Sequence, residues 1–249
     1  MKKWIVGAMV AVALACSGAP SAFAAPTGAF AVFAQCPARA AQVDGCLYAR
    51  VEGGYITLGR TVVPIAKTVV LQGGLLEEEE PFVKRLVGAQ DGETMTKMGQ
   101  PLPGGLFGHP LDAVTELAVP ASLIELLTNP LAFTLPIKVR LVSPLLGAEC
   151  SVGSSSHPIE LNMTTGSSGG LAGSPGTARG TEHGKILLTS GVAMVSSGFA
   201  VPKAGDCGSA VVNEAIDAKL GLPSSKNTVA AFDLKMELAN SEFVEESED

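Results

Sequence analysis

The stretch "AFTLPIKVRLV", residues 132–142, alternates apolar and polar side chains with a period of two. Its apolar face consists of Phe133, Leu135, Ile137, Val139 and Leu141. Thr134, Lys138 and Arg140 fall on the opposite face. This period is typical of a β-strand with one buried face. Pro136 belongs to the polar face and has no N–H to donate, which predicts an edge strand or a bulge.

The same period recurs along the chain. "TVAAFDLKMELA", residues 228–239, again carries apolar side chains on one face and charged ones on the other. Shorter candidate strands, each bounded by turn-forming residues, are "FAVFA" (30–34), "CLYARV" (46–51), "GYITLG" (54–59), "TVVPI" (61–65), "KTVVLQ" (67–72), "PIELNMTT" (158–165) and "KILLTSGVAMV" (185–195). Many short strands with frequent turns predict a single all-β, mostly antiparallel, sandwich-like domain over residues 25–240.

Two stretches favour short helices. "EEEEPFVKRLVG", residues 77–88, has acidic residues and a proline at its start and a glycine at its end, which suits the helix dipole and a helix stop. "PASLIELLTNP", residues 120–130, allows two or three turns between its prolines. Residues 164–184 are rich in Gly and Ser and predict a flexible surface loop.

Residues 1–24 have the pattern of a secretory signal. Lys2 and Lys3 precede an apolar run at residues 4–15, and Ala22 and Ala24 suit a cleavage site after residue 24. Lipid attachment at Cys16 is the alternative, although Leu14 stands where a small residue is expected. No later run of 18 apolar residues follows, so the sequence predicts no membrane-spanning segment after cleavage.

The charge balance is acidic. Without Lys2 and Lys3, the 17 basic residues fall to 15 against 24 acidic ones, which speaks against nucleic acid or anionic lipid as partners. Glu77–Glu80 and the tail at residues 241–249 hold nine of the acidic residues. We interpret both runs as solvated surface and expect the tail to be disordered; the alternative is a weak contact with Ca²⁺ or a polycation.

Four cysteines remain after the signal. An even number in an exported chain predicts two disulfides, with three possible pairings. Cys36 and Cys46 are close in sequence, with Pro37 and an Asp-Gly pair between them, so a single loop can join them. That pairing leaves Cys150 with Cys207.

"AGDCGSAVV", residues 204–212, resembles the way chymotrypsin-like proteases present their nucleophile, here with Cys207 in the nucleophile position. Such a protease needs a histidine before the nucleophile and early in the chain. His109, His157 and His183 each lie beside Gly or Pro, and none of them is early. A disulfide at Cys207 also removes the thiolate, so we expect no cysteine protease.

"GSSGG", residues 166–170, formally matches the Gly-x-Ser-x-Gly motif of serine hydrolases, with Ser168 as nucleophile. The following "LAGSPGTARG" cannot start the required helix, and no Asp lies between Ser168 and His183. The histidines are far apart in sequence, and the thiols are expected in disulfides, so we assign no metal, cofactor or catalytic residue. Asn162 begins a glycosylation sequon, which matters only if the secreting cell uses it.

Aromatic side chains are scarce. The only Trp is Trp4, and the two tyrosines are Tyr48 and Tyr55, so a sugar-binding face built from stacked rings is not expected. Aliphatic residues are abundant instead. Most of them should form the core, and the others are available to line an apolar groove for a lipid or a partner.

Several blocks of sequence resemble a family of uncharacterised secreted proteins found in actinobacteria. The more specific blocks are "LGAECSVGSSSHPI" (146–159) and "LGLPSSKNT" (220–228), and the resemblance runs from Thr27 to about Phe232. It implies export and cysteines used in disulfides, and it brings no catalytic residues. We therefore expect a secreted, non-enzymatic module that binds an apolar ligand or a cell-envelope component; the alternative is a hydrolase that uses Cys207 or Ser168.

Overall fold

The computed structural model describes residues 24–248. Apart from Ala24, the predicted signal segment lies outside the described residues, as does the alternative lipid site at Cys16. Among residues 24–248, no helix has the length and apolar character needed to cross a membrane.

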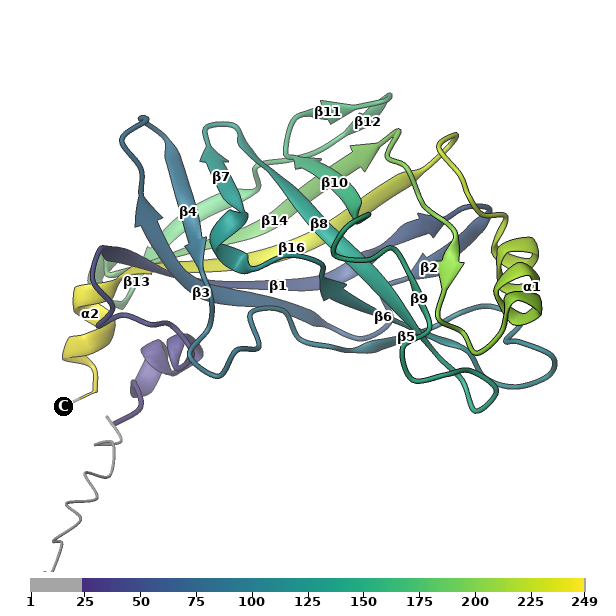
Figure 1. Cartoon of the computed structure of the whole chain (residues 1–249). Helices are drawn as coiled ribbons and strands as arrows, with labels where there is room; N and C mark the ends of the chain where they lie inside the picture. Colours follow the sequence, from purple (N-terminus) through teal and green to yellow (C-terminus); the bar gives the residue numbers. More distant parts are fainter. Residues whose placement is uncertain (1–23, 249) are drawn as a thin grey trace, which may run out of the picture.

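Most strands belong to one antiparallel sheet that closes on itself (Figure 1). Eight strands form the closed circuit, and the last of them pairs with the first. In spatial order they are β1 (Val43–Leu58), β3 (Val69–Glu77), β4 (Val83–Val87), β7 (Glu125–Thr128), β8 (Leu131–Val142), β10 (Ile159–Thr164), β14 (Ile186–Ser197) and β16 (Val229–Asn240). Opposite walls of this sheet face each other across a common core. The predicted all-β antiparallel fold is confirmed.

Shorter elements extend or cover the circuit. The additional strands are β2 (Thr61–Pro64), β5 (Gly99–Pro101), β6 (Asp112–Leu117), β9 (Ser151–Val152), β11 (Ser167–Ser168), β12 (Leu171–Ala172), β13 (Thr177–Thr181) and β15 (Ala204–Gly205). The α-helices are α1 (Ala210–Leu220) and α2 (Ser241–Glu246), and the 3₁₀ helices are η1 (Gly28–Phe33), η2 (Ala121–Leu123) and η3 (Glu182–Gly184).

The apolar face predicted for β8 points into the closed sheet. Ile137, Val139 and Leu141 are each 1% exposed and belong to the main core cluster. β16, predicted from the same period, lies in the opposite part of the circuit between β1 and β14. The two alternating stretches therefore form inner walls of one core, as their period required.

The prediction that Pro136 marks an edge strand or a bulge is wrong. β8 pairs with β10 on one side and with β7 and β6 in succession on the other. The Pro136 carbonyl accepts a hydrogen bond of 2.9 Å from the Ala118 N–H, just after β6 ends at Leu117. Since the N–H and C=O of one residue point to the same side of a strand, the missing donor faces the break between β6 and β7. The interruption of the neighbouring strand accommodates the proline.

One end of the closed sheet, which we call the α1 end, is covered by helix α1 (Figure 1). The disulfide between Cys150 and Cys207 lies just before the start of this helix. Ile216 and Leu220 of the helix are fully buried in the main core. Ser209 caps the start of the helix by accepting a hydrogen bond from the Val212 N–H. The α1 end is therefore filled with apolar side chains.

The opposite end, the α2 end, has a second apolar cluster on the outside of the sheet. Phe33 of the N-terminal segment and Val244 of α2 pack there with Cys36, Cys46 and other residues. The first and last described segments also meet at this end, where the Thr27 N–H donates a hydrogen bond of 3.1 Å to the Ser247 carbonyl. This cluster covers the outer wall of the sheet and is separate from the core cluster inside it.

Both helices predicted from sequence are misplaced. Residues 77–88 form the turn between β3 and β4 and then strand β4. The side chains of Lys84 and Leu86 both point to the interior, as residues two apart on a strand do, and pairing of β4 with β3 and β7 outweighs the local helix propensity. Within residues 120–130, only the short helix η2 is present, and β7 follows it. "FAVFA", residues 30–34, lies largely in η1 and is not a strand.

The predicted disordered tail and flexible loop also differ from the structure. Residues 241–246 form α2, which is held in place because Val244 is completely buried. The segment 164–184 contains β11, β12, β13 and η3, and its Ser174 forms a bridge with Ala193 of β14. Pairing with β14 supplies the backbone hydrogen bonds that a free loop would lack.

Candidate functional site

Both predicted disulfides are confirmed. Cys36 is bonded to Cys46 and Cys150 to Cys207, with S–S distances of 2.01 and 2.02 Å. The Cys207 sulfur is therefore not a thiolate. The "GDCG" sequence leads into α1, and the Cys207 N–H donates a hydrogen bond of 3.1 Å to the side chain of Asn213 in that helix.

The three histidines lie on separate segments. His109 is in the turn before β6, and His157 precedes β10 with its Nδ1 3.0 Å from the Ser156 Oγ. His183 belongs to η3, which follows β13. Across the described part of the chain, no hydrogen bond joins an imidazole to Cys207 or Ser168. The structure does not bring the proposed nucleophiles and bases together.

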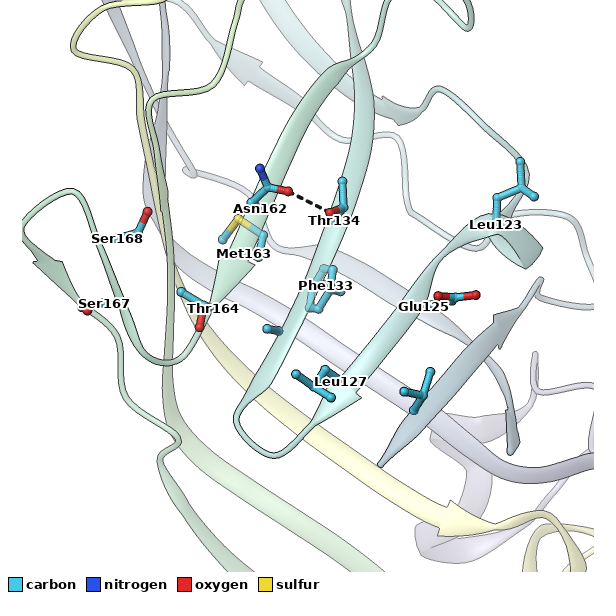
Figure 2. Close-up of a pocket in the computed structure, with 12 residues that line it drawn as sticks. Leu123, Glu125, Leu127, Phe133, Thr134, Asn162, Met163, Thr164, Ser167 and Ser168 are labelled. Carbon is cyan, nitrogen blue, oxygen red and sulfur yellow. Dashed lines mark hydrogen bonds between the residues drawn. The ribbon is translucent and has the colours of Figure 1, made fainter. Parts of the chain in front are cut away.

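Ser168 borders a hollow of about 620 Å³ on the outer face of β4, β7, β8 and β10. Figure 2 shows Thr134 and Asn162 side by side on β8 and β10, where the Thr134 hydroxyl donates a hydrogen bond of 2.8 Å to the Asn162 amide oxygen. Ser168 stands on the β11–β12 hairpin at one side, and Glu125 of β7 stands at the other.

This outer hollow offers little chemistry. Glu125 is the one ionisable side chain among its lining residues, and Arg85 lies 3.9 Å from it. The Ser168 hydroxyl is 3.0 Å from the hydroxyl of Ser197, which cannot act as a base at neutral pH. The hollow thus contains a serine and a carboxylate on opposite sides, without the contact that activates a nucleophile.

The interior of the closed sheet is more informative, because it is not completely filled. A cavity of about 60 Å³ lies in the middle of the interior, and a second of about 70 Å³ lies toward the α2 end. Four residues line both cavities and separate them, and we call them the waist. The waist residues are Leu71, Phe133, Met194 and Leu234.

Several side chains that face these cavities keep accessible surface although they point inward. On β16 they are Phe232, Leu234, Met236 and Leu238, all only partly buried. In a completely packed core such alternating positions would be fully buried, as Val139 and Leu141 are on β8. The partial exposure on β16 therefore belongs to an apolar space inside the sheet.

The lining of both cavities is almost entirely aliphatic or aromatic. Thr115 in one and Thr128 with Lys84 in the other are the polar side chains among the lining residues. Apolar cavities stay dry and take up apolar molecules. Together the two cavities are slightly smaller than the cavity of about 150 Å³ that takes up one benzene molecule. They therefore have room for about five methylene groups before any side chain moves.

Lys84 marks the boundary of the interior at the α2 end. Its ammonium group pairs with Asp44 and lies 3.4 Å from Glu77. Burial alone lowers the pKa of Lys84, but the hydrogen bond and negative charge of Asp44, joined by Glu77, raise that pKa above its usual value. Lys84 therefore stays charged and paired at the rim.

The apolar wall continues from the second cavity to the surface at this end. Leu187 of β14 is 43% exposed and is the register partner of Leu238, which lines the cavity. β13 pairs with β14 there and has no second neighbour among the described strands. The apolar wall therefore extends toward the surface at the α2 end, whereas the α1 end is filled by side chains of α1.

Within residues 24–248, no group of three or more His, Cys, Asp or Glu side chains is arranged to hold a metal ion. Comparisons of the chain with protein-family models, with curated proteins and with solved structures found no match. The family resemblance stays a prediction from the sequence blocks.

Sequence reasoning identified the apolar faces but not the cavities behind them. Phe133, Leu135 and Ile137 of the predicted β8 face line the middle cavity. The interior as a site was missed, because an aliphatic residue that lines a cavity has the same local pattern as one that fills a core. The abundance of aliphatic residues beside scarce aromatic ones was the available signal.

Proposed function

We propose that this protein is an exported, non-enzymatic binding protein of the cell envelope or extracellular space, and that it holds one aliphatic chain inside its closed sheet. The observation that carries the proposal is the partial exposure of the inward side chains of β16 around two apolar cavities. A narrow linear chain matches this space, and the flexible waist residue Met194 can move aside for it.

The compartment is supported by independent features. The two disulfides fit a protein that matures outside the cytoplasm. The sequence pattern of residues 1–24 and the family resemblance both favour export. A hydrolase is the weaker candidate, because the Cys207 sulfur is bonded to Cys150 and Ser168 contacts a second serine.

Calorimetric titration of the mature, disulfide-bonded protein with dodecyl maltoside tests the proposal. The uncharged head group and linear chain report on the interior alone, provided that the titration stays below the micelle concentration. Each buried methylene group contributes about 0.8 kcal/mol, and the total has to exceed the cost of association, so we expect weak, saturable binding of one dodecyl maltoside per protein.

Ala49→Leu should abolish this binding. Ala49 lines the cavity toward the α2 end and is 2% exposed, so the larger side chain fills space that the ligand would take. Ala172→Leu adds the same atoms on the exposed β12 and is the matched control. Equal affinity in both variants and the parent, or no binding by the parent, would contradict the proposal.

A further inference from the structure

The acidic residues of the β3–β4 turn gather at the α2 end of the closed sheet. β3 ends at Glu77 and β4 begins at Val83, and the turn between them projects at the α2 end (Figure 1). Asp44 at the start of β1 joins them through Lys84. We call Asp44 together with Glu77–Glu80 the acidic collar.

The collar is not neutralised by its neighbours. Lys84 pairs with Asp44 and Glu77, and Arg85 pairs with Glu78 at 2.7 Å. Glu79 and Glu80 are exposed and form no ion pair with any described residue. Five carboxylates thus face two basic side chains, and the excess negative charge lies at the turn.

Glu77 connects the collar to the wall of the cavity toward the α2 end. Glu77 follows Leu71 and Leu75 on the inward face of β3, both of which line the cavity toward the α2 end. It is also the register partner of Lys84, which lines the same cavity. A chain held in that cavity would therefore place its head group among these charges.

We propose that the natural ligand is a single-chain amphiphile with a positively charged head group, such as an amine or a quaternary ammonium. This inference rests on the proposed function, because it assigns the head group of the chain held in the interior. The buried aliphatic chain contributes the same binding free energy whatever the head group is. Differences in affinity between head groups therefore come from the collar. A cationic head is attracted by the unpaired carboxylates, and an anionic head is repelled.

The test compares three amphiphiles with the same dodecyl chain by calorimetric titration of the mature protein below their micelle concentrations. They are dodecyltrimethylammonium, dodecyl maltoside and dodecanoate. In low salt we expect the cationic compound to bind at least about tenfold more tightly than the anionic one, with the uncharged compound between them. The difference should shrink at about 0.5 M salt, where screening acts over only a few ångströms.

Two variants locate the preference. Glu79→Gln/Glu80→Gln removes the unpaired charges of the collar and should reduce the cation preference severalfold while the affinity for dodecyl maltoside stays unchanged. Glu149→Gln/Glu214→Gln removes two exposed charges, one beside Cys150 and one on α1, and is the control for net charge. This second variant should keep the preference of the parent.

The outcomes separate the two proposals. Binding of all three compounds with equal affinity, or tighter binding of dodecanoate, would overturn the assignment of the head group and leave the aliphatic site standing. A cation preference that both double variants reduce equally would overturn the role of the collar. Failure of all three compounds to bind would overturn the proposed function and this inference with it.

Discussion

Removal of the disulfide between Cys150 and Cys207 should destabilise the protein more than removal of the one between Cys36 and Cys46. The first bond joins residues 57 positions apart, and the second joins residues 10 positions apart. A disulfide restricts the unfolded chain more when it closes a longer loop. The chain-entropy relation gives about 4 kcal/mol for the long loop and just under 3 kcal/mol for the short one.

The perturbations are the double variants Cys150→Ala/Cys207→Ala and Cys36→Ala/Cys46→Ala. All four cysteines are at most 3% exposed, so the two variants lose similar packing and differ mainly in loop length. The native packing of Ile216 and Leu220 should keep α1 in place without the disulfide. The loss of folding free energy should therefore come from the greater conformational entropy of the unfolded chain.

Urea unfolding followed by far-UV circular dichroism measures both variants against the parent. This signal is preferred because the described residues contain no Trp and two tyrosines. We expect the free energy of unfolding to fall by about 1 kcal/mol more for the long-loop variant. An equal loss, or a larger loss for the short-loop variant, would refute the loop-length reasoning.

Three further changes test other parts of the fold. Burial raises the pKa of Glu116, but hydrogen bonds from its two basic neighbours on β8 lower this pKa overall. The ionised Glu116 therefore stabilises the fold by about 1 kcal/mol above pH 4.5, and this stabilisation disappears as the pH falls through the lowered pKa. The melting temperature of Glu116→Gln should accordingly be below that of the parent at pH 7 and converge with it in acid; a constant gap would argue against the ion pairs. Gly54→Ala should lower the free energy of unfolding in urea by more than about 2 kcal/mol, because φ at Gly54 is 109° and the new Cβ would lie 2.0 Å from the Ala231 carbonyl oxygen. Gly53→Ala is the control and should cost far less, since its new Cβ would lie 3.5 Å from the nearest atom. Val244→Asp should release α2, seen as faster hydrogen exchange over residues 241–246, because it buries a charge; unchanged exchange would mean that the helix is not held by this side chain.

The strands were predictable from sequence where the information is local. The alternation in β8 and β16 needs no knowledge of neighbours, because a strand with one buried face shows its period directly. The consequence of Pro136 needs such knowledge, since it depends on where β6 stops beside β8. A proline in a strand pattern predicts an edge strand from sequence alone, but the same proline is accommodated in a central strand when the neighbouring strand is interrupted beside it.

Helix α1 was missed although its boundaries carry signals. Ser209 is an N-cap, and Gly221 ends the helix with φ of 77°, two residues before Pro223. Only Ile216 and Leu220 are buried, so the apolar stripe that usually reveals a helix is nearly absent. Capping residues would have been the better guide here.

The interior could not be predicted from any window of sequence. Whether Leu234 or Met236 fills a core or borders a cavity depends on how many strands close the circuit and how far apart opposite walls stand. These are properties of long-range pairing, such as β8 with β10 and β16 with β1. Local periodicity identifies the face of a strand and leaves the distance to the opposite wall undetermined.

The meeting of the two ends of the described chain has a practical consequence for protein engineering. Thr27 donates from both its N–H and its hydroxyl to the Ser247 carbonyl, at 3.1 and 2.9 Å. A short peptide bridge at this point would join the ends without disturbing any strand pairing. New termini could then open at Gly169–Gly170, between β11 and β12, to give a circular permutant in which both former ends become one internal loop.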